Sequence, residues 1–267
     1  MTYLGKKNVV GIMIDALDYE GAINAIVGAA KERRGFAVST AAVHAVMEGV
    51  LNPEHKFRLN HLDMIAPDGQ PVRWALNLLH GSKLCDRVYG PKLTLKLCSR
   101  AEAEKLDVLF YGNTAETLNA LREKLMQMFP RLRIVGMLPS QFRKLSLDER
   151  DEIGRRIRDT GASIVIVGLG CPRQDSWSYE YRDILSVPII AVGGAFGVIA
   201  GNVAQAPKWM QDRGLEWLFR LYCEPKRLWR RYILLNPVYA VLVALQASGL
   251  LKFQTEGKQP TAELRYG

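Results

Sequence analysis

The sequence predicts an α/β protein with a Rossmann-like, mostly parallel sheet, helices on both faces of that sheet, and a C-terminal helical appendage. Short apolar runs alternate with longer segments of helical period, which is typical of parallel strands joined by helices. Several runs end in glycine or small polar residues that lead into a helix. After Pro207 the strand signals stop. We therefore expect an α/β body over residues 1–205, a helical appendage over 206–252 and a loose polar tail over 253–267.

Six apolar runs are long enough to form buried strands. They cover residues 9–14, 36–39, 108–111, 133–138, 164–167 and 189–192. Glycines follow three of them, at Gly112, at Gly168 and Gly170, and at Gly193 and Gly194. Because ligands bind outside the carboxyl ends of such strands, where glycine lets backbone amides approach a phosphate, we expect the functional site at this edge.

Composition limits the class of protein. With 267 residues and 48% hydrophobic content, the chain can bury one sizeable core or two small ones, which excludes disordered and fibrous classes. The four cysteines form no CxxC pair, so neither a zinc site nor a disulfide framework is indicated. The first apolar run stops at Asp15 and is too short for a signal peptide. We expect a reduced, cytosolic catalytic part.

The appendage is basic and apolar. From residue 206 onward, ten Lys and Arg face five acids, so over half of the net charge of +9 lies in the last quarter. A helix from Pro225 would align Trp229 and Ile233 on one side and arginines on another, as in helices that lie in a membrane surface. The stretch 232–251 has no charge and must be buried in protein or lipid. Membrane attachment is the favoured interpretation, and a helix packed on the body is the alternative.

Asp68 is the first candidate for chemistry. It follows the apolar residues Met64, Ile65 and Ala66 and precedes a helix that begins near Pro71, which places it at the mouth of the sheet. A carboxylate there could deprotonate an acceptor hydroxyl. By local pattern alone, an aspartate that caps the helix or holds an Asp-Gly turn is the stronger hypothesis.

Further candidates are Arg87 and the turn from Gly170 to Gln174. Arg87 could hold a phosphate or carboxylate, although an arginine on a loop is more often a solvated charge. The turn suits one phosphate or a base edge, with Gln174 as a polar contact. It lacks the third glycine of a dinucleotide fingerprint, which argues against a nicotinamide-dependent oxidoreductase. No Asp-x-Asp pair is present, so arginines and helix N-termini would stabilise a leaving diphosphate instead of a metal.

Together these segments resemble the WecG/TagA/CpsF family of bacterial glycosyltransferases, from Gly11 to about Pro237. The motifs that carry the resemblance are Pro67-Asp68-Gly69, Arg87-Val88-Tyr89-Gly90-Pro91, Gly170-Cys171-Pro172-Arg173-Gln174-Asp175, Val192-Gly193-Gly194-Ala195-Phe196 with Ala200-Gly201, and Gly214-Leu215-Glu216-Trp217-Leu218-Phe219-Arg220 running on to Glu224-Pro225-Lys226-Arg227 and Arg230-Arg231-Tyr232. The resemblance implies an inverting, metal-independent transferase without a cofactor. It would move a sugar from a UDP-sugar to a polyprenyl-diphosphate-linked saccharide in cell-envelope or exopolysaccharide synthesis.

The resemblance also implies roles for individual residues. Asp68 matches the family's proposed base, Thr40 and Arg87 match residues of the acceptor pocket, and Gln174 matches a polar pocket residue. Arg220, Arg227 and Arg230 match arginines of the appendage that close over the UDP diphosphate, together with the glycine turns at Gly170 and Gly194. With the resemblance added, the catalytic interpretation of Asp68 outweighs the capping one.

The resemblance places the protein on the cytoplasmic face of the bacterial inner membrane as a peripheral protein. It implies no nucleic-acid partner and permits a homo-oligomer. Three positions depart from the family pattern: Ala42 stands for an asparagine, Gly197 for an aspartate and Gln205 for an arginine. They leave open a second hypothesis, a non-catalytic nucleotide-sugar-binding or scaffolding subunit of a polysaccharide assembly complex.

Overall fold

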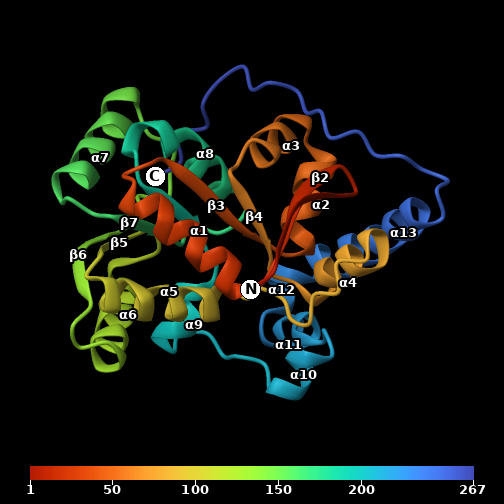
Figure 1. Cartoon of the computed structure of the whole chain (residues 1–267), viewed down its shortest axis with the longest axis horizontal. Helices are drawn as coiled ribbons and strands as arrows, with labels where there is room; N and C mark the ends of the chain where they lie inside the picture. Colours follow the sequence, from red (N-terminus) through yellow and green to blue (C-terminus); the bar gives the residue numbers. More distant parts are fainter.

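A six-stranded parallel sheet forms the centre of the computed structural model, which describes residues 1–267 (Figure 1). Its strands lie in the order β4-β3-β8-β7-β5-β6. Their bounds are β3 (Phe36–Ala41), β4 (Met64–Pro67), β5 (Asp107–Tyr111), β6 (Arg133–Leu138), β7 (Ile164–Val167) and β8 (Pro188–Ala191). The predicted α/β fold is confirmed, as are five of the predicted strands.

Helices cover both faces of the sheet. They are α1 (Tyr19–Lys31), α2 (Val43–Leu51), α3 (Pro53–Asn60), α4 (Gln70–His80), α5 (Gly90–Glu104), α6 (Ala115–Met128), α7 (Leu147–Asp159), α8 (Arg173–Leu185) and α9 (Ala195–Ala200). Local sequence sets several of the starts: Asp18 caps α1, Thr114 caps α6, and Ser146 forms a capping box with Glu149 at α7.

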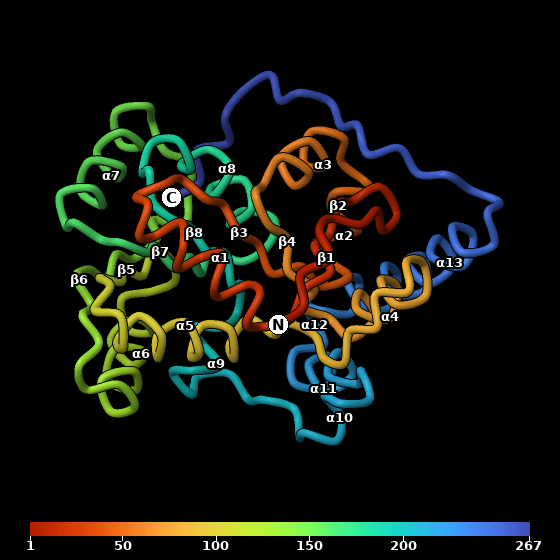
Figure 2. Tube along the Cα trace, in the orientation of Figure 1, coloured from red at the N-terminus to blue at the C-terminus, as the bar shows by residue number.

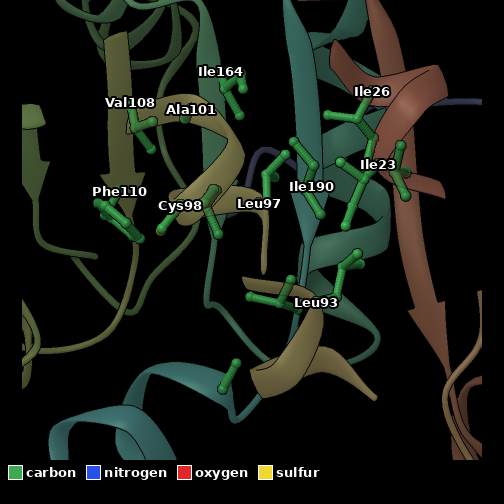
Figure 3. Close-up of a cluster of buried hydrophobic side chains, with 14 of the residues drawn as sticks. Ile23, Ile26, Leu93, Leu97, Cys98, Ala101, Val108, Phe110, Ile164 and Ile190 are labelled. Atoms are coloured by element: carbon green, nitrogen blue, oxygen red, sulfur yellow. The ribbon is translucent and has the colours of Figure 1, made fainter. Parts of the chain in front are cut away.

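The buried apolar side chains form three clusters, and successive residues of a strand face clusters on opposite sides of the sheet. In β7, Ile164 and Ile166 belong to the core under α1, α5, α6 and α9, while Val165 and Val167 face the core under α7 and α8. Figure 3 shows the first core, with side chains of α1 and α5 turned toward Val108, Ile164 and Ile190 of the sheet. Both faces of these strands are therefore buried, which explains their continuous apolar runs.

One predicted strand is wrong. Residues 9–14 do not form a strand of the main sheet; β1 (Tyr3–Val9) and β2 (Ile12–Leu17) form a separate antiparallel hairpin. The turn consists of Val10 at φ +52° and Gly11 at φ +87°, the positive values that a two-residue hairpin turn needs. Valine rarely adopts such a φ, so the run gives no turn signal.

The appendage is helical, as predicted. It comprises α10 (Lys208–Asp212), α11 (Glu216–Cys223), α12 (Pro225–Trp229), the π-helical segment η1 (Arg230–Leu234) and α13 (Leu235–Ala247). The last three join into one helix, Pro225–Ala247, of 23 residues and mean hydropathy 1.2, whose length and composition would suffice to cross a membrane. However, α13 also packs on the body: Tyr239 and Val243 are buried, and the Gln246 amide bonds the β1–β2 turn.

The tail that we expected to be loose lies along the protein surface. Residues 253–267 run from the end of α13 past α3 to the region of α7 and α8 in an extended path (Figures 1 and 2). Backbone groups of the tail bond the side chains of Asn8, Arg58, Asn60 and Glu180 along this path.

Candidate active site

The main cavity, about 380 Å³ in volume, lies at the carboxyl ends of the strands. It opens beside β3 and β8, which are neighbours in the sheet. From β3 the chain continues to β4 at one edge, then forms β5, β6 and β7 on the other side, and reaches β8 last. Adjacent strands whose connections diverge in this way form the crevice in which open α/β sheets bind ligands. The appendage closes the cavity from the other side with residues of α11, α12 and η1.

Asp68 lies in the wall of this cavity, directly after β4. Its backbone N–H donates to Ala41 O at 3.0 Å, and its Oδ2 accepts the Gly90 N–H at 3.4 Å. The carboxylate does not cap α4, whose N-cap is Gly69 and has no side-chain bond, so the capping hypothesis is wrong. Burial raises the pKa of Asp68 to about 6, although Arg87 and Arg220 act to lower it. A carboxylate with such a pKa is matched to accept a proton near neutral pH.

Glu216 joins the two arginines beside Asp68. The Arg87 guanidinium forms an ion pair with Glu216 and lies 4.4 Å above the Tyr89 ring. Arg220 Nε lies 3.6 Å from the other carboxylate oxygen of Glu216. Arg87 is therefore a buried, fixed charge and not a solvated one, and Glu216 couples the body to the appendage.

The glycine turns lie on the other side of the cavity. Gln174, buried at the start of α8, accepts the Gly193 N–H at 2.8 Å, and Thr40 Oγ1 donates to Ala191 O at 3.2 Å. Gly170 (φ +78°) and Gly193 (φ +60°) both need the left-handed region. Gly194, at the start of α9, lies beside Arg220, since a Cβ built on it would be 3.6 Å from an Arg220 nitrogen. An anion at this place would meet the Arg220 guanidinium and the N-terminus of α9.

Three appendage arginines line the cavity, and one of them differs from the prediction. Arg220 and Arg227 lie there as expected, but Arg230 does not, because its guanidinium lies 5.2 Å above the Trp229 ring. Arg231 takes its place. Arg231 lies four residues after Arg227, a spacing that places both side chains on one face of a helix.

Arg231 has no ion pair, whereas Arg227 pairs with Glu224 and Arg220 with Glu216. Its Nε is buried without a hydrogen-bond partner, and burial lowers its pKa, with further contributions from Arg220 and Arg227. A partly buried cation without an ion-pair partner is costly. The wall thus carries positive charge that an anionic ligand would neutralise.

The comparisons with known proteins agree with this geometry. The family model described as "Glycosyl transferase WecG/TagA/CpsF family" matches residues 7–252. The chain belongs to this family. An N-acetylglucosaminyldiphosphoundecaprenol N-acetyl-beta-D-mannosaminyltransferase of Bacillus spizizenii (strain ATCC 23059 / NRRL B-14472 / W23) is 30% identical over 213 residues, 79% of this chain and 80% of the relative. The protein of the same name from Bacillus subtilis (strain 168) is 27% identical over 213 residues, with the same coverage.

As a member of the WecG/TagA/CpsF family, the chain is a glycosyltransferase. Its three departures from the pattern have different structural consequences. Ala42 lines the cavity and is the N-cap of α2 without a side-chain bond. Gly197 is buried inside α9, and a Cβ there would be 2.8 Å from Val203 Cγ2. The Gln205 amide donates to Tyr89 Oη at 3.4 Å. Only Ala42 borders the cavity.

Sequence reasoning missed His44, Glu216 and Arg231 as site residues. His44 lines the cavity, where burial, together with Arg231, lowers its pKa to about 3. It is therefore neutral and adds no charge to the wall. Glu216 lies four residues before Arg220 on one helix, a spacing that predicts an ion pair between these two residues. The spacing gives no sign of the second ion pair of Glu216, with Arg87.

Proposed function

We propose that this glycosyltransferase moves a sugar from a UDP-sugar onto a polyprenyl-diphosphate-linked saccharide, with inversion and without a metal ion. The observation that carries the proposal is the placement of one carboxylate, Asp68, in the same cavity as a row of arginines that reaches the N-terminus of α9. A base and a diphosphate site are the two parts that a single displacement at an anomeric carbon requires.

In the reaction, Asp68 takes the proton of the acceptor hydroxyl. The hydroxyl oxygen forms a bond to the anomeric carbon while the bond from that carbon to the UDP oxygen breaks, and UDP leaves with the electron pair. Attack from the face opposite UDP inverts the configuration. Only one carboxylate acts, which fits the fact that Glu216 is held in ion pairs with Arg87 and Arg220.

The leaving diphosphate would bind between the glycine turns and the appendage. Arg220 lies beside Gly194, and the unpaired Arg231 offers a guanidinium with an unused Nε. Charge-assisted bonds from guanidinium groups to phosphate oxygens are among the strongest in proteins. Binding would also reduce the cost of the partly buried, unpaired Arg231 charge.

The relatives point to the acceptor class. Their printed names describe transfer of N-acetylmannosamine to N-acetylglucosaminyl-diphosphoundecaprenol. We infer a lipid-linked saccharide of this kind as the acceptor, with a role in cell-envelope polysaccharide synthesis. Because Ala42 removes a polar group from the cavity wall, the donor sugar need not be that of the relatives.

The appendage would hold the enzyme on the cytoplasmic face of the membrane. Its helices expose large apolar side chains, namely Trp209, Leu218, Tyr222, Trp229, Ile233, Leu234, Val238 and Val241. Interleaved arginines and lysines suit an anionic lipid surface. Because Tyr239 and Gln246 attach α13 to the body, we favour a helix that lies on the membrane over one that crosses it.

The test is release of UDP from a panel of UDP-sugars in the presence of a short-chain polyprenyl-diphosphate N-acetylglucosamine acceptor, with EDTA present. We expect one donor to give acceptor-dependent release and a product of inverted anomeric configuration by NMR. Binding of UDP without any turnover on the panel would instead support a non-catalytic binding subunit. Turnover that requires an added divalent cation would reject the metal-free mechanism.

A further inference from the structure

The last residues of the tail bond a loop at the rim of the active-site cavity. This rim loop comprises residues 139–145, between β6 and α7. Leu145 N–H donates to Arg265 O at 2.8 Å, and Gly267 N–H donates to Arg143 O at 3.0 Å, which forms a short antiparallel bridge around Lys144 and Tyr266. The tail thus adds a strand-like partner to a loop that belongs to no sheet.

A buried carboxylate anchors the tail next to this bridge. Glu180 of α8, whose side chain is only 3% exposed, accepts the Leu264 N–H at 2.7 Å and the Arg265 N–H at 2.9 Å. The buried Arg58 guanidinium donates to Ala262 O at 2.9 Å. Two charge-assisted bonds from a buried acid to consecutive backbone amides fix the path of the tail.

The rim loop carries an aromatic side chain into the cavity wall. Phe142 lines the main cavity together with Asn113 and Leu169, yet it remains 55% exposed. It also adopts φ +53°, a value that phenylalanine rarely takes without support from its surroundings. Phe142 therefore presents a ring to the cavity only while the loop around it is held.

Phe142 lies on the side of the cavity opposite Asp68. Asp68 follows β4 at one edge of the sheet, Gly194 follows the central strand β8, and Phe142 follows β6 at the opposite edge. With the diphosphate at Gly194, as the proposed function has it, the nucleoside would extend toward Leu169 and Phe142. An exposed aromatic ring offers a stacking face to a nucleobase.

We propose that residues 259–267 of the tail position the rim loop, so that Phe142 packs against the nucleobase of the donor and the tail sets how tightly the donor binds. The proposal rests on the proposed function for the identity of the donor. The tail lies outside residues 7–252, the part of the chain that matches the family model.

The experiment is calorimetric titration of UDP into the full chain, five variants and one combined variant. A chain that ends at Lys258 lacks the bridge, and Glu180→Gln weakens the anchor at nearly constant volume. Phe142→Ala removes the ring, and Phe142→Tyr keeps it. Glu256→Ala, an exposed tail position without a side-chain bond, is the matched control.

We expect the shortened chain and Phe142→Ala to bind UDP about tenfold more weakly, the lower part of the range for base stacking on an aromatic ring. Phe142→Tyr and Glu256→Ala should bind as the full chain does, and Glu180→Gln should bind with intermediate affinity. Because tail and ring act through one contact, the shortened chain that also carries Phe142→Ala should lose no more than either change alone. Hydrogen exchange at the Leu145 amide should be faster in the shortened chain.

Equal Kd values for the full and shortened chains would overturn the inference and leave the proposed function intact. Losses of UDP affinity that add in the variant combining the shortened chain with Phe142→Ala would also overturn it. If the shortened chain fails to fold, Glu180→Gln combined with Phe142→Ala provides the same comparison. Failure of the full chain to bind UDP would reject the proposed function and this inference together.

Discussion

Asp68 should determine the acidic side of the pH–rate profile. Its pKa is raised to about 6, chiefly by burial, and a general base acts only when it is deprotonated. Activity is therefore present above the pKa and lost as pH falls through it. With a pKa of about 6, roughly nine-tenths of the carboxyl groups are ionised at pH 7 and roughly one-tenth at pH 5, so kcat/KM should fall about tenfold between them.

Two substitutions that each remove a charge should move the acidic limb of the pH–rate profile in opposite directions. Arg87→Gln removes a cation that lowers the pKa of Asp68, so the limb should move upward by about one unit or more. Glu216→Gln removes an anion that raises it, and leaves Arg87 and Arg220 without their counter-charge, so the limb should move downward. Glu216→Gln keeps the shape of the side chain, whereas Arg87→Gln replaces the guanidinium by a shorter neutral amide.

The assay is UDP release at subsaturating donor from pH 4.5 to 8.5, at constant ionic strength because surface charges are screened by salt. The profile of kcat/KM reports the free enzyme, in which these contacts exist. A limb that stays at the same pH in both variants would show that another group titrates. Movement of the acidic limb in the same direction in both variants would refute the electrostatic account of the site.

Three further predictions follow from single contacts. Arg231→Met should weaken UDP binding about tenfold or more, because it removes the unpaired guanidinium, whereas Arg230→Met should change it little. Calorimetry checks both, and equal effects would refute the assignment of Arg231 to the diphosphate site. Gly197→Ala should destabilise the fold by about 1–3 kcal/mol, since the new Cβ would press on Val203 Cγ2, and Val203→Ala should restore part of the loss in thermal unfolding. A chain that ends at residue 205 should no longer sediment with anionic lipid vesicles, while the full chain should; sedimentation of the shortened chain would assign membrane attachment to the body.

Much of the sheet is visible in the sequence for a physical reason. Runs such as Ile164 to Val167 are buried on both faces, so every residue is apolar and β-branched. The strand β4 was missed because its apolar run has only three residues, Met64 to Ala66, and ends at Pro67. The hairpin was missed because its turn depends on Val10 at positive φ, a conformation that only the surrounding packing maintains.

The site was predicted in part, and the errors have one cause. Asp68, Thr40, Gln174 and the glycine turns belong to strand ends, whose position follows from the sheet itself. The arginines of the appendage depend on helical phase: the resemblance selected Arg230, whereas the spacing of four residues places Arg231 on the face of Arg227. The contacts of the tail join residues more than 80 positions apart and have no local signature.

The most direct test of the account is the Asp68→Asn variant. The substitution keeps the size of the side chain and removes its ability to accept the proton. We predict that UDP binds to Asp68→Asn with the affinity of the unaltered chain, while acceptor-dependent turnover falls about a hundredfold or more, as expected for loss of a general base. Turnover within about threefold of the unaltered enzyme would contradict the assignment of Asp68 as the base and, with it, the proposed mechanism.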